Sequence, residues 1–350
     1  GGDEFVAFVP GADEVIAAAV AERLQQALGE PLEVETQTYA LSAGIGIAFY
    51  PEDGDTPEAL LKHADIAMYR AKAGGGYRFY RPEMGAKLEK RLEVARRLAG
   101  ALKAGRLQLY YQPQVHLATG QVCGAEALLR WFDPEWGWVS PTEFIPIAEE
   151  RGMMVCLGEW VLEEACKQMK AWRNAGLVLE GRLAINVAAQ QMEDAAFVDR
   201  VQGILGSAGI EPSLFEFELT ESGMMADPER AVTVMQALKA MGLALSIDDF
   251  GTGYSSLSYL KRFAADKLKI DLSFVRDMLD DRNDHAIVSA IIAMAKRLGL
   301  KVLAEGVEEA AQAQALLALG CDEAQGYYFG RPEPAEVFAR RWLRGARPKS

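Results

Sequence analysis

Two adjacent carboxylates, Asp248 and Asp249, follow an apolar segment and directly precede a glycine-rich one. In the apolar segment, Leu243, Leu245 and Ile247 alternate with small residues, which predicts a strand. Two like charges at a buried strand end repel each other and lose solvation. A divalent metal would relieve both costs, so the pair predicts a metal site. The alternative is a solvated turn that carries two Asp residues.

More polar side chains stand at or near the ends of the other predicted strands. They are Glu126, Arg130, Asn186, Glu218, Glu221, Lys269, Asp271, Glu305, Glu308 and Gln325. In a (β/α)₈ barrel the carboxyl ends of the strands meet on one face, so these groups would converge. Carboxylate and amide oxygens are hard ligands suited to Mg²⁺ or Mn²⁺, and so many acids predict a two-metal site for phosphoryl chemistry. The alternative is a polar barrel mouth without chemistry.

The elements that would position these groups begin after Arg106. Short apolar strands then alternate with helical stretches about eight times over roughly 240 residues, which is typical of a (β/α)₈ barrel. The expected strands are Leu107–Val115, Val122–Trp131, Leu183–Val187, Phe215–Leu219, Leu243–Asp248, Lys267–Ile270, Lys301–Gly306 and Ala324–Phe329. A hairpin-length turn, HLATGQ, joins the first two, so we expect an antiparallel pair there and a modified barrel.

Helices are expected between the later strands, packed as an outer ring. Two of them are Glu159–Ala175 and His285–Leu298. The second places apolar residues on one stripe at helical spacing: Ile287, Val288, Ile291, Ile292 and Ala295.

The chain before the barrel predicts a β-α-β-α-β part of an α/β domain. Its opening GGDEF and FVAFV indicate the second strand of a hairpin, and a helix is expected over Asp13–Leu28. A strand over Leu41–Phe49, a helix from Pro57 to Lys72 capped by Thr56, and a short strand over Tyr77–Tyr80 follow. A charged connecting helix is expected at Pro82–Leu102.

Composition narrows the class of protein. The 350 residues are 50% hydrophobic and 25% charged, as in a globular protein of roughly two domains. The net charge of −13 argues against a polymeric nucleic acid partner. No apolar run is long enough to span a bilayer, and we expect a cytoplasmic chain whose membrane attachment, where it exists, depends on other segments. The four cysteines form no C-x-x-C pair and are expected to be reduced and mostly buried. The three histidines are scattered, which argues against a zinc site.

Several motifs, in order along the chain, resemble the EAL family of cyclic di-GMP phosphodiesterases. They are EALLRW (126–131), INVAAQQ (185–191), ELTES (218–222), IDDFGTGYSSL (247–257), KLKID (267–271), AEGVE (304–308) and QGYYFGRP (325–332). The opening GGDEF, LSAGIGIA and ADIAMYRAKAGGG (64–76) resemble the C-terminal half of a GGDEF diguanylate cyclase domain. On this basis we expect a partial GGDEF domain at 1–81, a linker helix at 82–105 and an EAL domain at 106–345.

The resemblance implies a role for each matching residue. Glu126, Asn186, Glu218 and Asp248 would bind a first metal, and Asp248, Asp249 and Glu305 a second. Glu305 is the implied general base, with Lys269 holding the attacking water or its neighbour. Contacts to substrate or to the groups around it are implied for Gln112, Pro113, Leu129, Arg130, Asp271, Glu308, Gln325 and Pro332. Glu221 resembles the residue that anchors the loop Asp249–Ser256, in which Gly251 and Gly253 suit a mobile turn.

The expected reaction is metal-dependent hydrolysis of one phosphodiester bond of cyclic di-GMP to linear 5′-pGpG. The implied partners are two Mg²⁺ or Mn²⁺ ions and a second copy of the chain, which would form a homodimer through the barrel. Three alternatives stay open: an inactive receptor that binds cyclic di-GMP and signals by shape, a cyclase, and an N-terminal part that serves only as a regulatory or dimerising platform. A cyclase is not expected, because the first hairpin strand and the upstream half of that domain lie outside this chain.

Overall fold

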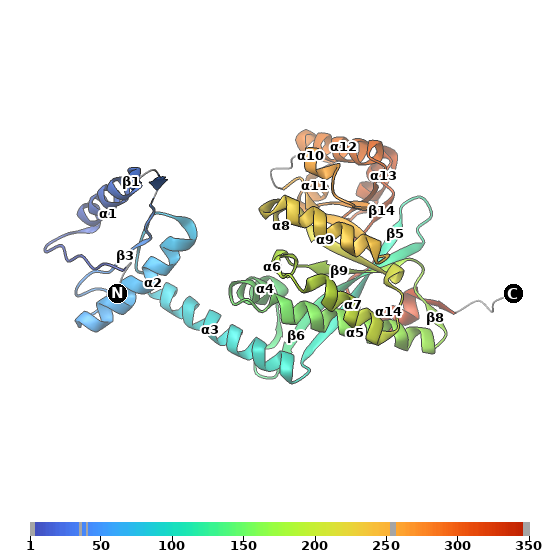
Figure 1. Ribbon diagram of the computed structural model, residues 1–350, viewed down its shortest axis with the longest axis horizontal. Coiled ribbons are helices and arrows are strands. Elements are labelled where there is room, and N and C mark those ends of the chain that lie inside the picture. Colours follow the sequence, from blue (N-terminus) through green and yellow to red (C-terminus); the bar gives the residue numbers. More distant parts are fainter. Residues whose placement is uncertain (1–3, 35–36, 40, 253–256, 346–350) are drawn as a thin grey trace. The chain divides into compact units, whose positions relative to one another are not determined.

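The computed structural model describes residues 4–34, 37–39, 41–252 and 257–345 (Figure 1). The chain divides into two compact units, residues 1–96 and 97–350, and each is described by itself. The long helix α3, Pro82–Lys103, contains the boundary and matches the connecting helix expected from the sequence.

The first unit is a small α/β arrangement. Its elements are α1 (Glu14–Gly29), β1 (Leu32–Val34), β2 (Gln37–Tyr39), β3 (Ile45–Ile47), α2 (Pro57–Gly74) and β4 (Tyr77–Phe79). Strands β3 and β4 pair in parallel, and β1 and β2 form an antiparallel hairpin that the sequence did not predict. Asp13 and Thr56 cap the two helices by accepting backbone N–H groups.

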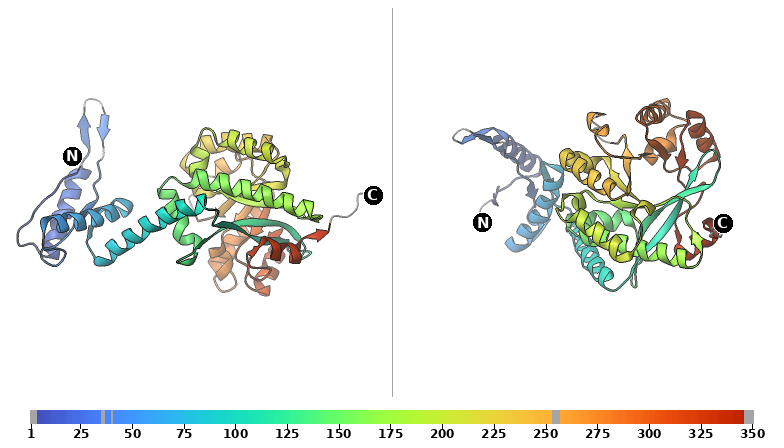
Figure 2. Two further views of the ribbon diagram at one scale, coloured as in Figure 1. Left: turned by 90° about the horizontal axis from the view of Figure 1, so that it is seen from below. Right: turned by 45° about the vertical axis from the view of Figure 1, so that its right-hand side comes forward.

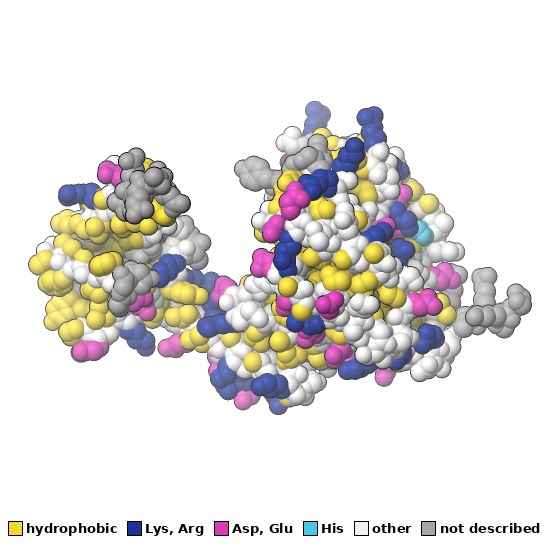
Figure 3. Space-filling model, in the orientation of Figure 1, with side chains coloured by type: hydrophobic (Ala, Val, Ile, Leu, Met, Phe, Trp, Pro, Cys, Tyr) yellow, Lys and Arg dark blue, Asp and Glu magenta, His cyan; other side chains and the backbone are white. Residues whose placement is uncertain are grey.

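Residues 4–9 differ from the expected hairpin strand, because they form no strand in the described structure. Phe5 and Phe8 are 91% and 85% exposed, so this apolar segment has neither a partner strand nor a packed face among the described residues. Figure 3 shows further hydrophobic side chains over the visible face of this unit. The strand expected at Leu41–Phe49 also shortens to the three residues of β3.

The second unit contains a closed barrel of eight strands. They are β5 (Leu107–His116), β6 (Val122–Asp133), β9 (Arg182–Val187), β10 (Phe215–Thr220), β11 (Ala244–Phe250), β12 (Lys267–Ile270), β13 (Lys301–Ala304) and β14 (Glu323–Ala324). The order around the barrel is β5-β14-β13-β12-β11-β10-β9-β6, and β6 pairs again with β5. Strand β5 is antiparallel to both neighbours, and the other pairings are parallel. The modified barrel with an antiparallel first strand is therefore confirmed.

Helices surround these strands (Figure 2). Their bounds are α4 (Pro141–Glu150), α5 (Met154–Asn174), α6 (Ala189–Glu193), α7 (Phe197–Ala208), α8 (Glu221–Ala226), α9 (Pro228–Ala240), α10 (Leu257–Leu260), α11 (Leu272–Asp277), α12 (Arg282–Arg297), α13 (Ala310–Leu319) and α14 (Ala335–Trp342). Short pieces complete the unit: β7 (Gly137–Val139), β8 (Leu177–Val178), η1 (Pro212–Leu214), β15 (Glu333–Pro334) and β16 (Arg344–Gly345). The expected stripe of α12 is buried except at Ile287, which is 37% exposed.

The two faces of a barrel strand carry different chemistry. In β10, Phe215, Phe217 and Leu219 alternate with Glu216 and Glu218, and all five are buried. The apolar set belongs to the main hydrophobic core, where each side chain contributes about 1.5–3 kcal/mol by burial. The acidic set therefore points into the barrel, because successive strand residues face opposite sides. We call the end where the parallel strands finish the mouth and the end where they begin the floor.

The eighth strand is much shorter than its sequence suggests. The expectation was Ala324–Phe329, but β14 contains only Glu323 and Ala324. The chain then turns, since Tyr328 and Phe329 donate their backbone N–H groups to Val307 and Gly326 rather than to a neighbouring strand. The seam between β14 and β5 therefore has only two paired positions within the described barrel.

Candidate active site

Parallel register brings the expected site residues together at the mouth. Glu218 pairs with Asn186 on β9, and Thr220 pairs with Asp248 on β11. Lys269 is the third residue of β12, and Glu305 follows β13 directly, with its backbone N–H bonded to Ile270. Strand period and register thus place side chains from four neighbouring strands, and one that directly follows a fifth, on one inner surface.

Lys269 forms the centre of this surface. Its side chain is fully buried, and Nζ lies 2.6 Å from Glu218 Oε2, 2.7 Å from Glu305 Oε1 and 3.0 Å from Asp248 Oδ2. Burial by itself would lower the pKa of Lys269, but the three carboxylates outweigh it and raise that pKa well above its usual value. One fixed ammonium therefore balances only part of the charge of three acids, and the site retains an excess of negative charge.

The carboxylates of Asp248, Asp249 and Glu305 form a group with metal-ligand spacing. One oxygen from each lies within 4.8 Å of the others. Burial, and then the negative charge of Asp248 and Asp271, raises the pKa of Asp249 to about 6. Burial also raises the pKa of Glu305 to about 8, against the opposing effect of Lys269. The positive charge of Lys269 therefore does not offset the effect of burial on either acid.

Asp249 also has an unusual backbone. Its φ of 53° lies in the left-handed region, which is uncommon for residues other than glycine and occurs often at functional sites. The register between β11 and β12 shifts between Ile247 and Phe250, so the strand is irregular at this point. The irregularity lets two consecutive Asp residues contribute oxygens to one group, although a regular strand would send them to opposite faces.

Glu126, on β6, is held by a set of amides. Its Oε1 accepts a hydrogen bond of 2.6 Å from Asn186 Nδ2, and its Oε2 accepts one of 2.5 Å from Gln325. The side chain of Gln325 also donates to Gln112 at 3.0 Å and accepts from Gln114 at 3.1 Å. Gln112 donates in turn to the backbone oxygen of Gly330 at 3.0 Å. The amides hold Glu126 in one orientation.

Only one of the two carboxylate oxygens of Glu218 has a partner at the mouth among the described residues. Burial raises its pKa well above the usual value, with Lys269 opposing and Glu126 and Asp248 adding to the rise. Its Oε2 meets Lys269, whereas its Oε1 is buried without a hydrogen-bond partner among the described residues. An orphaned carboxylate oxygen in such a place costs free energy unless a cation or a donor completes it.

Arg130 provides positive charge beside the acids. Its guanidinium lies 5.7 Å from the ring centre of Tyr110 and donates to the backbone oxygen of Leu129 at 2.9 Å. Burial lowers its pKa from the usual value, and Glu126 opposes that effect. A half-buried arginine of this kind suits a phosphate ligand.

The other expected site residues lie further out. Asp271 caps α11 by accepting from the backbone of Ser273 at 2.9 Å, and Glu221 Oε2 accepts from the backbone of Gly251 at 2.9 Å. Glu308 is exposed and Pro332 is half-buried, and Pro113 is buried on β5. Within the described structure, these three form no hydrogen bond or ion pair with Asp248, Asp249 or Glu305. Gly253 and Ser256 lie outside the described residues.

A second layer of buried charge, which was not predicted from the sequence, lies at the floor. Lys267 Nζ lies 3.0 Å from Glu216 and 2.9 Å from Glu323, and Glu323 also meets Lys301 at 3.0 Å. Lys267 also donates to Gln114 at 3.5 Å, which connects this layer to the amides. The sequences KLK (267–269) and EFE (216–218) could have predicted this layer. Alternate residues of a strand face the same side, so both charged residues of each segment lie on one face.

The model for the EAL domain family matches residues 95–332, more than half of the chain. The chain belongs to the EAL domain family. Residues 1–78 match a second family model, the diguanylate cyclase GGDEF domain, so the EAL barrel follows a partial GGDEF domain.

Curated relatives share this arrangement over nearly the whole chain. The chain is 45% identical over 338 residues to the bifunctional diguanylate cyclase/cyclic di-GMP phosphodiesterase MucR of Pseudomonas aeruginosa. This match covers 96% of this chain and 49% of that protein. It is 38% identical over 346 residues to the cyclic di-GMP phosphodiesterase PdeR of Escherichia coli, covering 98% of this chain and 52% of that protein. The chain thus spans about half the length of these relatives.

Solved structures resemble the EAL barrel closely. One, of the PaMucR phosphodiesterase in complex with c-di-GMP, has 46% identity and a TM-score of 0.68, covering 70% of this chain and 99% of that chain. Another, of the EAL enzyme Bd1971 with cAMP and cyclic di-GMP bound, has 30% identity and a TM-score of 0.69, covering 82% and 76%. Among the described residues, no helix is both long and apolar enough to cross a membrane.

Proposed function

We propose that this EAL protein hydrolyses one phosphodiester bond of cyclic di-GMP to linear 5′-pGpG with the help of two Mg²⁺ or Mn²⁺ ions. The observation that carries the proposal is the group of Asp248, Asp249 and Glu305, whose oxygens lie within 4.8 Å of one another. The names of the curated relatives support the substrate. The solved PaMucR complex supports binding of the same ligand at a barrel of this fold.

The donor set fits hard divalent cations. Glu126, Asn186, Glu218 and Asp248 would hold the first ion, with the orphaned Glu218 Oε1 as a ready ligand. Asp248, Asp249 and Glu305 would hold the second, and the raised pKa values of the last two are consistent with acids that need a cation. When bound, the ions would supply a water of lowered pKa and stabilise charge that develops on the phosphate.

The side chains of the chain itself have distinct roles in this proposal. Glu305 takes the proton of the attacking water, and Lys269, 2.7 Å away, holds its carboxylate in place. Arg130, with the backbone at Leu129, binds substrate phosphate. The Lys269 side chain is fully buried, so its ammonium is held among the carboxylates and not by solvent.

Gln112 and Gln325 were expected to contact the substrate or the groups around it, and the second of these roles fits their hydrogen bonds. The polar atoms of Gln112 and Gln325 are engaged with each other, with Glu126 and with Gly330. We therefore propose that these amides orient Glu126 as a metal ligand. Pro113, Asp271, Glu308 and Pro332 keep the proposed contacts to the ligand or to the groups around it.

The assembly and boundaries are also proposals. We propose a homodimer through the EAL barrel, coupled to the site by the loop that Glu221 holds at Gly251. The proposed division is a partial GGDEF domain at 1–81, a linker helix at 82–105 and the EAL domain at 106–345. The first unit would then act as a regulatory or dimerising platform.

The test is incubation of the purified chain with cyclic di-GMP and Mg²⁺ or Mn²⁺, followed by chromatography of the products. We expect linear 5′-pGpG, no turnover in excess chelator, and inhibition by Ca²⁺, whose larger and looser shell fits the site poorly. Full turnover in excess chelator would contradict the two-metal mechanism. Tight binding of cyclic di-GMP without any product in either metal would instead favour the receptor alternative.

A further inference from the structure

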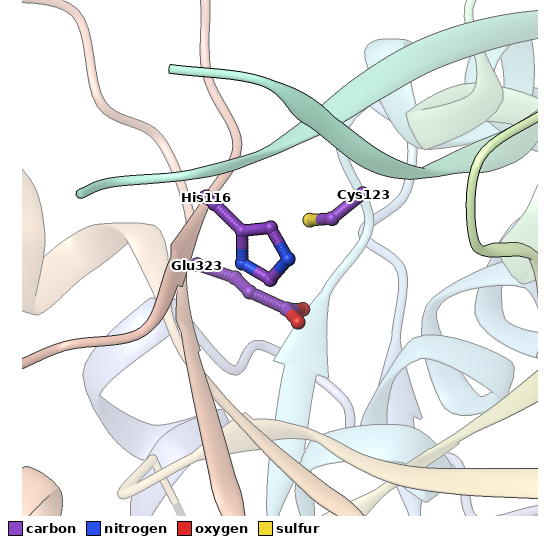
Figure 4. A group of neighbouring side chains, drawn as sticks. All are labelled: His116, Cys123 and Glu323. Carbon is purple, nitrogen blue, oxygen red and sulfur yellow. The ribbon is translucent and has the colours of Figure 1, made fainter. Parts of the chain in front are cut away.

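A separate group of possible metal ligands lies at the floor of the barrel. It consists of His116 at the end of β5, Cys123 near the start of β6 and Glu323 at the start of β14. One ligand atom of each lies within 4.8 Å of the others. Figure 4 shows the imidazole between the thiol and the carboxylate, with all three side chains directed toward the same space.

The pairing of three strands produces this arrangement. Glu323 and His116 are direct partners in the antiparallel pair of β14 and β5, so their side chains lie on the same face. On the other side of β5, Gln114 pairs with Gly124 and Val115 pairs with Val122, which leaves Cys123 as the extra residue of a bulge. A bulge re-aims a side chain, and here it turns the thiol toward the histidine.

The bulge is closely packed from outside. Gly181 has a φ of +107°, and a Cβ at that position would lie 1.7 Å from the backbone oxygen of Cys123. Only glycine fits there, so the segment before β9 fixes the backbone of Cys123. The same burial raises the pKa of the Cys123 thiol to about 12, which argues against a nucleophilic or redox role for this cysteine.

Glu323 can bind a metal ion with a carboxylate oxygen in addition to its contacts with two lysines. Its carboxylate contacts Lys301, whose side chain is 57% exposed and can turn to solvent, and Lys267, which keeps Glu216 as a second carboxylate. The floor therefore contains two lysines and two glutamates whose charges balance. A divalent cation that binds one thiolate adds a single net positive charge to this group.

We propose that His116, Cys123 and Glu323 form a Zn²⁺ site at the floor of the barrel. Nitrogen, sulfur and oxygen donors together favour zinc over Mg²⁺ or Mn²⁺, and three protein ligands leave the fourth tetrahedral position to water. The ion ties β14, β5 and β6 together at the seam where β14 and β5 have only two paired positions in the described structure. Its role is to reinforce closure of the barrel.

The test uses Co²⁺ as a coloured substitute for Zn²⁺. Chelator-treated protein is titrated with Co²⁺ in excess Mg²⁺, which occupies the oxygen ligands at the mouth but competes poorly for a thiolate. We expect about one equivalent of Co²⁺ to give thiolate-to-cobalt charge-transfer absorption, which added Zn²⁺ abolishes. Cys123→Ser should lose this absorption, and Cys156→Ser, at an exposed free cysteine, should keep it.

A second variant keeps the proposal testable if Cys123→Ser fails to fold. His116→Ala retains the thiol and should weaken Co²⁺ binding at least about tenfold, a loss that removal of even an outer-shell partner can produce. Zn²⁺ should also raise the unfolding temperature of the wild type and of Cys156→Ser more than that of His116→Ala. Absence of the charge-transfer band in the wild type, or equal Co²⁺ affinity in His116→Ala, would overturn the proposal.

Discussion

Replacement of Lys269 by methionine should destabilise the barrel in a way that a divalent metal reverses. The variant keeps the length of the side chain but removes the ammonium that lies 2.6–3.0 Å from three carboxylates. Loss of one partner from a buried ion pair costs about 3–5 kcal/mol, because the remaining charge is uncompensated. We expect a loss of this size in chelator, and recovery of most of it in saturating Mg²⁺, which supplies the missing positive charge.

Lys267→Met is the matched control. Lys267 is also buried between carboxylates, Glu216 and Glu323, but at the floor and away from the mouth. Its replacement should cost a similar free energy of unfolding that Mg²⁺ does not restore. The two variants therefore separate loss of a buried cation from loss of a cation next to the proposed metal site.

Denaturant unfolding monitored by tryptophan fluorescence suits this comparison, because all six tryptophans lie between residues 131 and 342 and report only the barrel. The cost of Lys269→Met should shrink as the pH falls, since the carboxylates then become protonated and need no cation. An equal cost for Lys269→Met with and without Mg²⁺, or no cost at either pH, would refute the reasoning.

Four further predictions concern chemistry and control. Glu305→Gln should lower turnover, measured by product formation, by at least ~10²-fold. It should lower the affinity for cyclic di-GMP, measured by calorimetry, by a smaller factor. A variant with wild-type turnover would exclude this residue as the base. Mg²⁺ affinity should rise between pH 6 and 8 with release of protons, because Asp249 and Glu305, with pKa values of about 6 and about 8, must ionise to bind the ion. Calorimetry in buffers of different ionisation enthalpy measures the affinity and the protons released. A Mg²⁺ affinity that does not change with pH would contradict this prediction. Gly253→Val should impair turnover in a folded barrel, and kinetics that match the wild type at every protein concentration would leave the loop coupling unsupported. The Glu305→Gln variant, supplied with GTP and Mg²⁺, should not accumulate cyclic di-GMP. Glu4, the acid of the GGDEF motif, is exposed and belongs to neither of the two groups with metal-ligand spacing among the described residues. Accumulation of cyclic di-GMP would show that the first unit is active.

Strand periodicity predicted the barrel well because its strands are short, apolar on one face and separated by long helices. Lys267–Ile270 was predicted with its actual bounds, and Glu218, Asp248 and Lys269 fell on the inner face as period two requires. The short β14 was harder to predict, since Tyr328 and Phe329 have strand-forming side chains, yet their backbone N–H groups bond to Val307 and Gly326 rather than to a neighbouring strand. Side-chain type alone does not determine whether a backbone N–H bonds to a neighbouring strand, to a turn or to a loop such as the one at Val307.

Other features depended on contacts that no local pattern contains. The FVAFV segment looks like a strand, yet a strand requires a neighbour, and residues 4–9 have none in the described structure. The histidines seemed scattered, but β5, β6 and β14 bring His116 to Cys123 and Glu323 across more than 200 residues of sequence. The cysteines were also expected to be mostly buried, whereas Cys156 is exposed and Cys123 only partly covered.

The reversed direction of β5 determines where the chain enters the barrel. In a barrel of parallel strands the first strand starts at the floor, whereas Leu107 pairs with Trp131 near the carboxyl end of β6, at the mouth. The end of α3 is fastened at the same level, because Arg97 contacts Asp133 at 2.9 Å and Glu135 at 2.5 Å and lies over the ring of Trp136. A twist or pull transmitted along α3 is thus delivered to the rim of the mouth, without passing through the length of the barrel.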